Sequence, residues 1–495
     1  MSSIEEQRKT RIKKLKLLKS KGLEPFPSKS SRELTLAEAA EKFSELENKG
    51  GAKWLAGRIL SIRGQGAIMF LTLFDGTGGF QILLKKDVLG VEKFDLFGST
   101  IDIGDFVEAK GKFFTTQRGE KTLEAHDWRV LAKSLRPLPE KWHGLVDEET
   151  KLRKRYLDIL SDPAVRQIFI EKNKFWASMR EFMIRAGFLE IEMPVLEPTP
   201  GGAEAEPFVT HMKALDEDFY LRISLELPLK KMLVAGYEKV FEIGRIFRNE
   251  GISSTHLQDY TQMEFYWAYA DFEMLLDFIE KLYQHVIKET FGTLKIKFKG
   301  EEMDWSGKWE RVDYLPLFKE NTGIDLNKAE DKDLEKYLDG RKVKYQKFAE
   351  RGRLLDLVFK EVRKEGIVWK KKKLAGPIFL INQPVELEPL AKRNGRNPKL
   401  VERMQVIAYS MELGKGFGEL NDPLDQRERF EAQMKLREKG DTEAQILDED
   451  YLEAMEYGMP PAVGFGISER LFSVLKGISV REGVVFPLMK RKSSN

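Results

Sequence analysis

The sequence contains no cysteine and only five histidines, at positions 126, 143, 211, 256 and 285. The lack of cysteine excludes disulfides, thiolate nucleophiles and cysteine zinc sites, and the histidines do not have the spacing of metal ligands. No apolar run is long enough to span a membrane, and the charged N-terminus lacks the apolar core of a signal peptide. These absences predict a protein without a membrane segment and with a cytoplasmic location.

The chain does have a large apolar fraction and closely balanced charge. Apolar residues make up 42% and charged residues 33% of 495 residues, which predicts two or three globular domains with a sizeable core. The net charge is only +3, so contact with nucleic acid must come from local basic patches. One patch lies in the basic N-terminal segment, residues 1–51, where residues 4–22 predict an amphipathic helix. This helix either binds RNA phosphates or docks on the next domain with a solvated face.

Residues 52–134 have the pattern of short strands separated by turns. Five strands are predicted, at 54–63, 67–74, 80–85, 106–115 and 121–132. This number of strands favours a small OB-type β-barrel, a fold that often binds single-stranded nucleic acid. Phe70 lies on the less apolar side of its strand, with Thr72, so its ring is either an exposed platform for a base or part of the core.

Residues 238–267 predict two long strands joined by a polar loop, because apolar and polar residues alternate with a period of two. The polar sides carry Glu242, Arg248, Glu250, Tyr260, Gln262, Glu264 and Tyr266. Such a face suits a ligand with phosphate and ammonium groups, since arginine matches phosphoryl oxygens and an aromatic ring beside it can stack on a base. The alternative is a sheet surface covered by salt bridges.

A proline-rich stretch at residues 135–150 breaks both periodicities and is predicted to be a linker. The second domain, residues 151–495, begins with a predicted helix over 163–186 and a strand that stops at Pro194. A highly charged insertion is expected at about 292–400. Helices and strands are thus mixed within the second domain, and the predicted fold class is α+β.

Several stretches resemble the motifs of a known family. Phe247-Arg248-Asn249-Glu250, the loop with His256 and the following aromatic-Thr-x-x-Glu run resemble motif 2 of the class II aminoacyl-tRNA synthetases. The run 264–271 is similar to the lysyl version of that motif. Residues 163–194 resemble motif 1, and residues 464–470 resemble motif 3. The resemblance implies a catalytic domain with an antiparallel sheet flanked by helices, an anticodon-binding barrel and a homodimer formed through motif 1.

The resemblance is to the bacterial type of lysyl enzyme, extends over about residues 52–490 and implies a set of nucleotide-binding residues. A substrate carboxylate can attack the α-phosphate of ATP without a general base, so positioning and charge neutralisation are the main requirements. Arg248 and Arg470 are the implied catalytic residues. The implied ATP-binding residues are Arg248, Glu250, His256, Tyr260, Glu412 and Arg470. Mg²⁺ is the implied cofactor, with Glu412 and Gln405 as its ligands.

Lysine is the implied amino-acid substrate, because carboxylates gathered in one pocket attract a cation. The implied lysine-binding residues are Gly202, Glu226, Glu264, Tyr266, Lys415, Phe417 and Glu419. In the barrel, Phe70, Gln81 and Asp127 are the implied anticodon-binding residues. The expected function is that of an ATP-dependent lysine–tRNA ligase, which forms lysyl-adenylate and pyrophosphate and then transfers lysine to the 3′ end of tRNA-Lys.

Several positions depart from the family pattern. The loop reads His256-Leu257-Gln258-Asp259 where the lysyl family usually has His-Asn-Pro-Glu. Gln405 stands where a metal-binding glutamate is common, Lys415 replaces an asparagine, and Ser468 lies in a motif 3 that is one residue short. Lys415 could instead pair with the substrate carboxylate or a phosphate. Two alternatives therefore stay open: a paralogue that modifies a protein, and a catalytically impaired RNA-binding homologue. The predicted barrel argues against the first, and lysine-dependent exchange between ATP and pyrophosphate would exclude the second.

Overall fold

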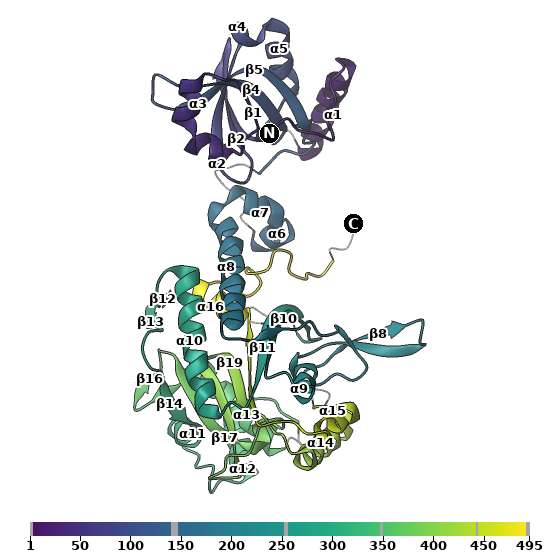
Figure 1. Cartoon of the computed structure of the whole chain (residues 1–495), viewed down its shortest axis with the longest axis vertical. Helices are drawn as coiled ribbons and strands as arrows, with labels where there is room; N and C mark the ends of the chain where they lie inside the picture. The colour runs from purple at the N-terminus through teal and green to yellow at the C-terminus, as the bar shows by residue number, and fades with distance from the viewer. Residues whose placement is uncertain (1–2, 140–146, 252–255, 347–349, 442–443, 492–495) are drawn as a thin grey trace. The chain divides into compact units, whose positions relative to one another are not determined.

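The structure is a computed structural model that describes residues 3–139, 147–251, 256–346, 350–441 and 444–491 (Figure 1). Part of the predicted linker, residues 140–146, and part of the loop in motif 2, residues 252–255, lie outside the described residues. The chain divides into two compact units, Met1–Val146 and Asp147–Asn495.

The first unit contains a closed five-stranded barrel in the order β1-β2-β3-β5-β4. Its strands are β1 (Lys53–Gln65), β2 (Ile68–Phe74), β3 (Gly79–Lys85), β4 (Phe106–Thr115) and β5 (Lys121–Ala132). The OB-type barrel is therefore confirmed. The short helices α2 (Leu36–Glu41) and α3 (Phe43–Lys49) precede the barrel, while α4 (Lys86–Leu89) and α5 (Val91–Thr100) lie between β3 and β4 and were not predicted. Phe94 and Phe97 of α5 are buried in the barrel core.

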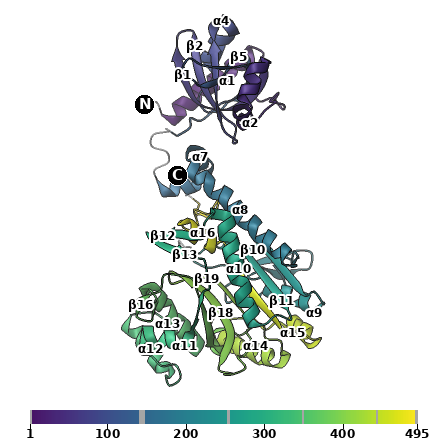
Figure 2. The same ribbon diagram turned by 60° about the vertical axis from the view of Figure 1, so that its left-hand side comes forward.

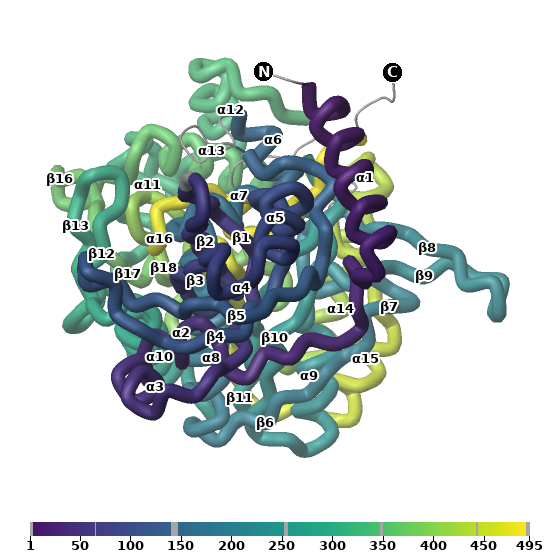
Figure 3. Tube along the Cα trace, turned by 90° about the horizontal axis from the view of Figure 1, so that it is seen from above, coloured from purple at the N-terminus to yellow at the C-terminus, as the bar shows by residue number. Residues whose placement is uncertain are grey.

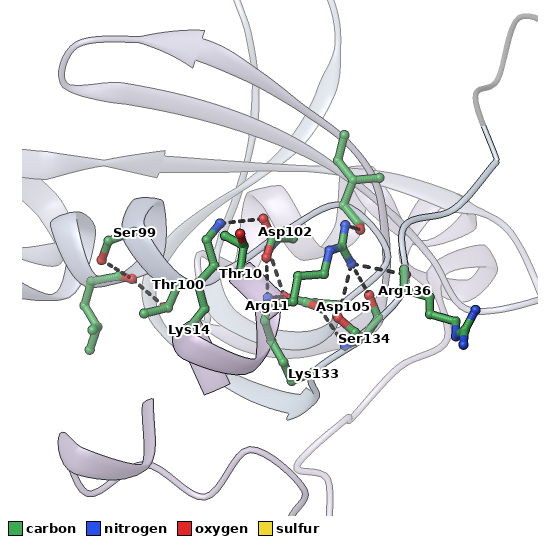
Figure 4. A network of polar contacts seen from close by, with 12 residues as sticks. Thr10, Arg11, Lys14, Ser99, Thr100, Asp102, Asp105, Lys133, Ser134 and Arg136 are labelled. Atoms are coloured by element: carbon green, nitrogen blue, oxygen red, sulfur yellow. Dashed lines mark hydrogen bonds and ion pairs between the residues drawn. The ribbon is translucent and has the colours of Figure 1, made fainter. Parts of the chain in front are cut away.

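Helix α1 (Ile4–Ser20) lies against the outside of this barrel (Figure 3). Its buried Arg11 donates hydrogen bonds to Ser134 Oγ at 2.5 Å and to the Ile103 carbonyl at 3.0 Å. Lys14 Nζ donates to Asp102 Oδ1 at 2.6 Å (Figure 4). The predicted helix is thus docked on its own unit, and two of its basic side chains face the barrel.

A fully buried lysine organises the polar network beneath α1 (Figure 4). Lys133 Nζ donates to Asp102 Oδ2 at 2.5 Å and to Asp105 Oδ2 at 2.7 Å. The backbone N–H of Ser134 donates to the other oxygen of Asp105 at 2.8 Å. Burial alone would raise the pKa of Asp102, but hydrogen bonds from Lys133 and Lys14 outweigh it and lower that pKa.

The second unit is built on an eight-stranded sheet in the order β14-β17-β18-β19-β20-β11-β10-β6. The strands are β14 (Glu310–Asp313), β17 (Ile378–Pro384), β18 (Leu400–Ala408), β19 (Met411–Gly418), β20 (Ala462–Ser468), β11 (Asp259–Ala268), β10 (Lys239–Phe247) and β6 (Leu189–Glu190). Only the outer pairs, β14 with β17 and β10 with β6, are parallel. The two strands of motif 2 are β10 and β11, as predicted, and they pair in antiparallel register.

Two long helices cover the apolar face of this sheet, α8 (Pro163–Arg185) and α10 (Phe272–Phe291) (Figure 2). Phe241, Phe265 and Phe465 from the sheet are buried in one core with residues of both helices. The opposite face is covered in part by α9 (Glu226–Val234), α14 (Pro423–Glu438) and α15 (Glu449–Glu456). This opposite face carries polar residues of both strands, as predicted. Arg248 and Glu250, which were expected on the first strand, instead follow its end at Phe247.

Two predicted segments differ in the structure. The strand expected to run to Pro194 is only the two residues of β6, because the Met193 N–H donates to the Glu242 carboxylate at 2.9 Å instead of continuing the sheet. The charged stretch 292–400 supplies β14 and β17 to the main sheet. Its other elements are β12 (Lys295–Phe298), β13 (Glu301–Asp304), α11 (Tyr314–Thr322), α12 (Asp331–Gly340), α13 (Arg351–Glu365), β15 (Val368–Trp369) and β16 (Lys372–Lys373).

The remaining elements lie at the edges of the second unit. Helices α6 (Glu148–Arg153) and α7 (Arg155–Ser161) precede α8, and α16 (Arg470–Lys476) follows β20. The small sheet of β7 (Leu196–Glu197), β8 (Phe208–Met212) and β9 (Glu217–Leu221) includes a hairpin that projects from the unit (Figures 1 and 3). Within the described ranges, no helix is both long and apolar enough to cross a membrane.

Candidate active site

A cavity of about 610 Å³ opens on the polar face of the eight-stranded sheet. Twelve of the predicted site residues line it: Gly202, Glu226, Arg248, Glu250, His256, Tyr260, Glu264, Tyr266, Glu412, Lys415, Phe417 and Arg470. The two remaining predicted residues of this unit, Gln405 and Glu419, are buried next to the lining. The structure therefore brings the predicted residues to one place.

The register of three neighbouring strands produces the floor of this cavity. Glu264, Gly466 and Lys415 stand opposite one another, and Tyr266, Gly464 and Phe417 form the next row. Residues that are paired across strands point to the same face, so both rows face the cavity. A Cβ atom on Gly464 would lie 2.2 Å from Glu419 Oε1 and 2.4 Å from Tyr266 Cε1. Glycine is required at this position because neighbouring side chains fill the space above it.

One end of the cavity is acidic, and Glu264 is its best-anchored carboxylate. Its Oε1 accepts hydrogen bonds from Ser224 Oγ at 2.9 Å and from the Leu225 N–H at 3.2 Å. The Tyr266 hydroxyl donates to Oε2 at 2.9 Å. Burial of the Tyr266 phenol between carboxylates raises its pKa well above the ordinary value, so the ring stays neutral and can donate.

The other two carboxylates of the acidic end share a buried lysine that was not predicted. Lys230 Nζ donates to Glu226 Oε1 at 2.6 Å and forms an ion pair with Glu419. Burial raises the pKa of Glu226 to about 7 in spite of Lys230, and it raises the pKa of Glu419 well above its usual range. Among the described residues, neither oxygen of Glu419 has a partner with hydrogen-bond geometry.

The other end of the cavity is basic. The Arg248 guanidinium lies 5.7 Å from the centre of the Tyr260 ring, and its Nε donates to the Ile223 carbonyl at 3.3 Å. Arg470 is the first residue of α16, and its backbone N–H donates to Ser468 Oγ at 3.4 Å. The shortened motif 3 therefore still delivers an arginine to the cavity at a helix start. Partial burial and the charge of Arg470 lower the pKa of His256, so its ring is neutral at pH 7.

The three predicted residues of the barrel lie on its outer side. Phe70 is half-buried and is not part of the barrel core. Gln81 Nε2 donates to Thr122 Oγ1 at 2.9 Å on the neighbouring strand. Asp127 accepts from Lys93 Nζ of α5 at 2.8 Å.

Two family models match this chain in the regions of the two units. The model for class II tRNA synthetases (D, K and N) matches residues 147–490, and the model for the OB-fold nucleic acid binding domain matches residues 53–131. The chain belongs to the class II D, K and N tRNA synthetases.

This synthetase is similar over nearly its whole length to several lysine–tRNA ligases. The one from Syntrophomonas wolfei is 42% identical over 99% of this chain and 98% of its own length. The one from Thermotoga maritima is 41% identical over 99% of this chain and 97% of its own. The one from Halalkalibacterium halodurans is 41% identical over 98% of this chain and 97% of its own.

The departure at Lys415 is compensated in this class II synthetase by a carboxylate that was not predicted. Lys415 Nζ donates to Glu388 Oε2 at 3.1 Å, and Arg403 Nε lies 3.5 Å from the same oxygen. Burial opposes ionisation of Glu388, but the two cations outweigh it and lower its pKa. Lys415 thus pairs with a carboxylate of the protein, a partner that the sequence did not indicate.

The departure at Gln405 changes the residues available to a metal ion. Gln405 Nε2 donates to Glu412 Oε2 at 2.8 Å, and its Oε1 accepts from Gln383 at 2.9 Å. Arg363 Nη1 lies 3.2 Å from the same Glu412 oxygen. Across the described ranges, no group of three or more Asp, Glu or His side chains could hold a metal. Among the described residues, Glu412 is a carboxylate that would suit a magnesium ion whose other ligands come from the substrate.

The sequence carried a signal for some of the residues that were missed. Lys230 follows Glu226 by four residues on α9, the spacing at which a glutamate and a lysine meet on one helix face. Arg403 lies on the same side of β18 as Gln405. Glu388 had no local signal, because it comes from the irregular segment after β17.

Proposed function

We propose that this class II synthetase is an ATP-dependent lysine–tRNA ligase. The observation that carries the proposal is a cavity with three carboxylates, Glu226, Glu264 and Glu419, at one end and Arg248 and Arg470 at the other. Such a cavity suits a diamino acid placed beside a triphosphate. The similarity to lysine–tRNA ligases over nearly the whole chain supports it.

The first step joins the carboxylate of lysine to ATP. The carboxylate oxygen attacks the α-phosphorus, the bond from that phosphorus to the bridging oxygen breaks, and pyrophosphate leaves. Arg248 holds the carboxylate and the α-phosphate and offsets the charge that develops between them, an effect worth about 3 kcal/mol. Arg470 binds the γ-phosphate. No general base is required, because the carboxylate is ionised at neutral pH.

The nucleotide is held by residues on β11 and in the loop of motif 2. Burial raises the pKa of Tyr260, so its neutral ring stacks on the adenine, while Glu250 and His256 contact the nucleotide. Glu412 would hold a magnesium ion, which would supply charge neutralisation at the phosphates. Gln405 contributes an amide in place of a second carboxylate.

The acidic end selects the amino acid. Glu226, Glu419 and Tyr266 receive the side-chain ammonium group, with Phe417 as a wall. Glu264 and the backbone at Gly202 receive the α-ammonium group; Gly202 has φ +81°, and its Cβ would lie 2.9 Å from Glu226 Cβ. Lys415, held by Glu388, lies near the substrate carboxylate and the phosphates.

The second step transfers lysine to tRNA. The terminal ribose hydroxyl of tRNA-Lys attacks the carbonyl carbon of the adenylate, and AMP leaves. The barrel domain, residues 52–134, reads the anticodon through Phe70, Gln81 and Asp127. Stacking of a base on the Phe70 ring contributes binding free energy whichever base is present. The catalytic domain, residues 151–495, forms a homodimer through the motif 1 segment, and the enzyme works in the cytoplasm.

Exchange between ATP and pyrophosphate, measured with each proteinogenic amino acid in turn, tests the first step. Lysine alone should support fast exchange, and charging of a tRNA-Lys transcript should follow. A protein acceptor charged in preference to tRNA would favour the paralogue, and absent exchange would favour the impaired homologue.

Replacing Arg248 should remove most of the exchange activity. Arg248→Ala is expected to lower the exchange rate by about 10²- to 10³-fold, because charge on the transferring group is left unbalanced. Arg245→Ala is the matched control, since Arg245 lies on β10, just before Arg248, but pairs with Asp259 outside the cavity lining. A near-normal rate in Arg248→Ala would refute the role given to this residue.

A further inference from the structure

The buried lysine of the acidic end has no part in the steps described above. Lys230 is 0% exposed, and its ammonium group lies among residues proposed to receive the substrate's ammonium. Its Nζ contacts Glu226 and Glu419, and it lies 5.3 Å from the centre of the Phe417 ring and 5.7 Å from that of Tyr266. Two carboxylates and two aromatic rings thus surround the ammonium group of Lys230.

The fold holds the Lys230 side chain in this position. It sits inside α9, one turn after Glu226, with Leu229 and Leu233 of the same helix buried around it. Burial would favour a neutral amine, but Glu226 and Glu419 outweigh it and raise its pKa well above the ordinary value. The group is therefore a positive charge that two ion pairs hold in the interior of the unit.

The positive charge of Lys230 offsets part of the negative charge of the acidic end. Glu226, Glu264 and Glu419 are 4%, 3% and 2% exposed, and Lys230 is the only cation that forms an ion pair with any of them in the described parts of the chain. Once ammonium groups are bound and all three carboxylates are ionised, three negative charges and one positive charge leave two net negative charges. A lysine substrate brings two ammonium groups, while its carboxylate faces the arginines at the other end.

We infer that Lys230 is a specificity-determining positioning residue, which sets the charge of the amino-acid pocket to match a substrate with two ammonium groups. It does so by holding Glu226 and Glu419 in place and cancelling one of three acidic charges. The inference deepens the proposed function and rests on it. Without Lys230, the third carboxylate has no counter-ion in the complex with lysine, and an uncompensated buried charge opposes binding.

The test compares the Michaelis constants for lysine and ATP in the exchange reaction. Lys230→Met should raise the KM for lysine about tenfold or more and change the KM for ATP by less than about twofold. Lys231→Met is the matched control, because the neighbouring lysine pairs with Asp450 at the surface, and it should change neither constant. An unchanged KM for lysine in Lys230→Met, or equal increases in both constants, would overturn the inference.

A second variant separates charge balance from loss of structure. Glu226→Gln alone should weaken lysine binding, since one net negative charge remains. Added to Lys230→Met, the same change restores two net negative charges, so the double variant should bind lysine more tightly than Lys230→Met. It also removes one buried charge of each sign, which keeps the helix foldable if the single variant is not. Losses that simply add would contradict the inference.

The proposed function and this inference can fail separately. Absence of lysine-dependent exchange in the unaltered protein would refute the proposed function. Titration calorimetry with lysine would then still compare the unaltered protein, Lys230→Met and the double variant. Equal affinities in the three proteins would refute the charge balance.

Discussion

Each unit of this synthetase buries one lysine between two carboxylates, but the two arrangements differ in how many of the carboxylate oxygens accept hydrogen bonds. In the barrel, Lys133 lies between Asp102 and Asp105, and all four carboxylate oxygens accept hydrogen bonds from lysines or backbone N–H groups. In the catalytic unit, Lys230 lies between two glutamates with raised pKa values. The first arrangement is complete in itself, whereas the second has an excess of acid.

This difference separates a structural network from a binding site. A buried polar network with every partner present stabilises one conformation and needs nothing further. A buried carboxylate without enough donors is unfavourable to ionise, and it gains most when a cation arrives. A buried lysine between two carboxylates thus helps to fix α1 on the barrel in one unit and to prepare a pocket for ammonium groups in the other.

The largest effect is expected from breaking the complete network. Lys133→Met leaves Asp105 buried without its cation, which should lower the free energy of unfolding of the barrel by about 3–5 kcal/mol. Urea unfolding of the full chain, with hydrogen exchange of β4 and β5, measures this loss. The control is Lys49→Met, which removes an exposed pair with Glu45 and should cost under about 0.5 kcal/mol. Equal stability of the two variants would contradict the comparison.

The arrangement around Lys230 should respond in the opposite way when one of its carboxylates is removed. Glu419→Gln removes a carboxylate whose charge is unfavourable when the pocket is empty, so the melting temperature should not fall. The KM for lysine should rise by about 10- to 100-fold, and the KM for ATP should change little, because a charged hydrogen bond to the substrate is lost. Asp105→Asn in the barrel is the counterpart and should lower stability. Equal increases in the KM values for lysine and for ATP would contradict the assignment of Glu419 to the lysine pocket.

The two units should also respond differently to pH. Glu226 has a pKa raised to about 7, so it ionises as pH rises through 7 and the affinity for lysine should increase about tenfold between pH 6 and 8. Lysine binding near pH 7 should release protons, which calorimetry in buffers of different ionisation enthalpy detects. Asp102 has a lowered pKa, so its contribution to barrel stability is present above its ordinary value of 3.8 and is lost as pH falls below it. Proton uptake on lysine binding would contradict this assignment.

The smallest effect concerns the lysines of α1 that point away from the network. Lys9, Lys13 and Lys16 are exposed, share one helix face and have no ion pair within the described ranges. Changing all three to glutamine should weaken tRNA binding severalfold and flatten its salt dependence, with unchanged stability. The control removes the same charge from Lys371, Lys372 and Lys373 of the catalytic unit. An equal loss of tRNA affinity in both triple variants would contradict a specific role of α1 in tRNA binding.

Much of the fold was predictable from local patterns. The five barrel strands and the two strands of motif 2 have alternating apolar residues, and the alternation follows directly from which face is buried. The membership of β14 and β17 in the main sheet was not predictable, because their pairing joins segments that are far apart in the sequence. The strand before Pro194 was overestimated, since nothing local shows that the Met193 N–H is taken by a side chain.

The site residues that lie in recognisable motifs were predictable, whereas the residues that pair with them from outside the motifs were not. Arg248, Glu264 and Arg470 lie in stretches with recognisable spacing. Glu388 could not be found, because a single carboxylate in an irregular segment becomes meaningful only when Lys415 is seen beside it. Lys230 is an intermediate case, with helical spacing that indicated a partner for Glu226 but not that the pair would be buried.

The crowding above Gly464 limits how the enzyme can be redesigned. No larger residue fits there, so this strand cannot be used to shrink the pocket toward shorter diamino acids. Enlargement for acylated or otherwise extended lysine derivatives must come from trimming Phe417 or Tyr266, whose rings stand on either side of the bare backbone. Any such change also removes an aromatic neighbour of Lys230, so engineered tolerance for neutral side chains and loss of preference for lysine should appear together.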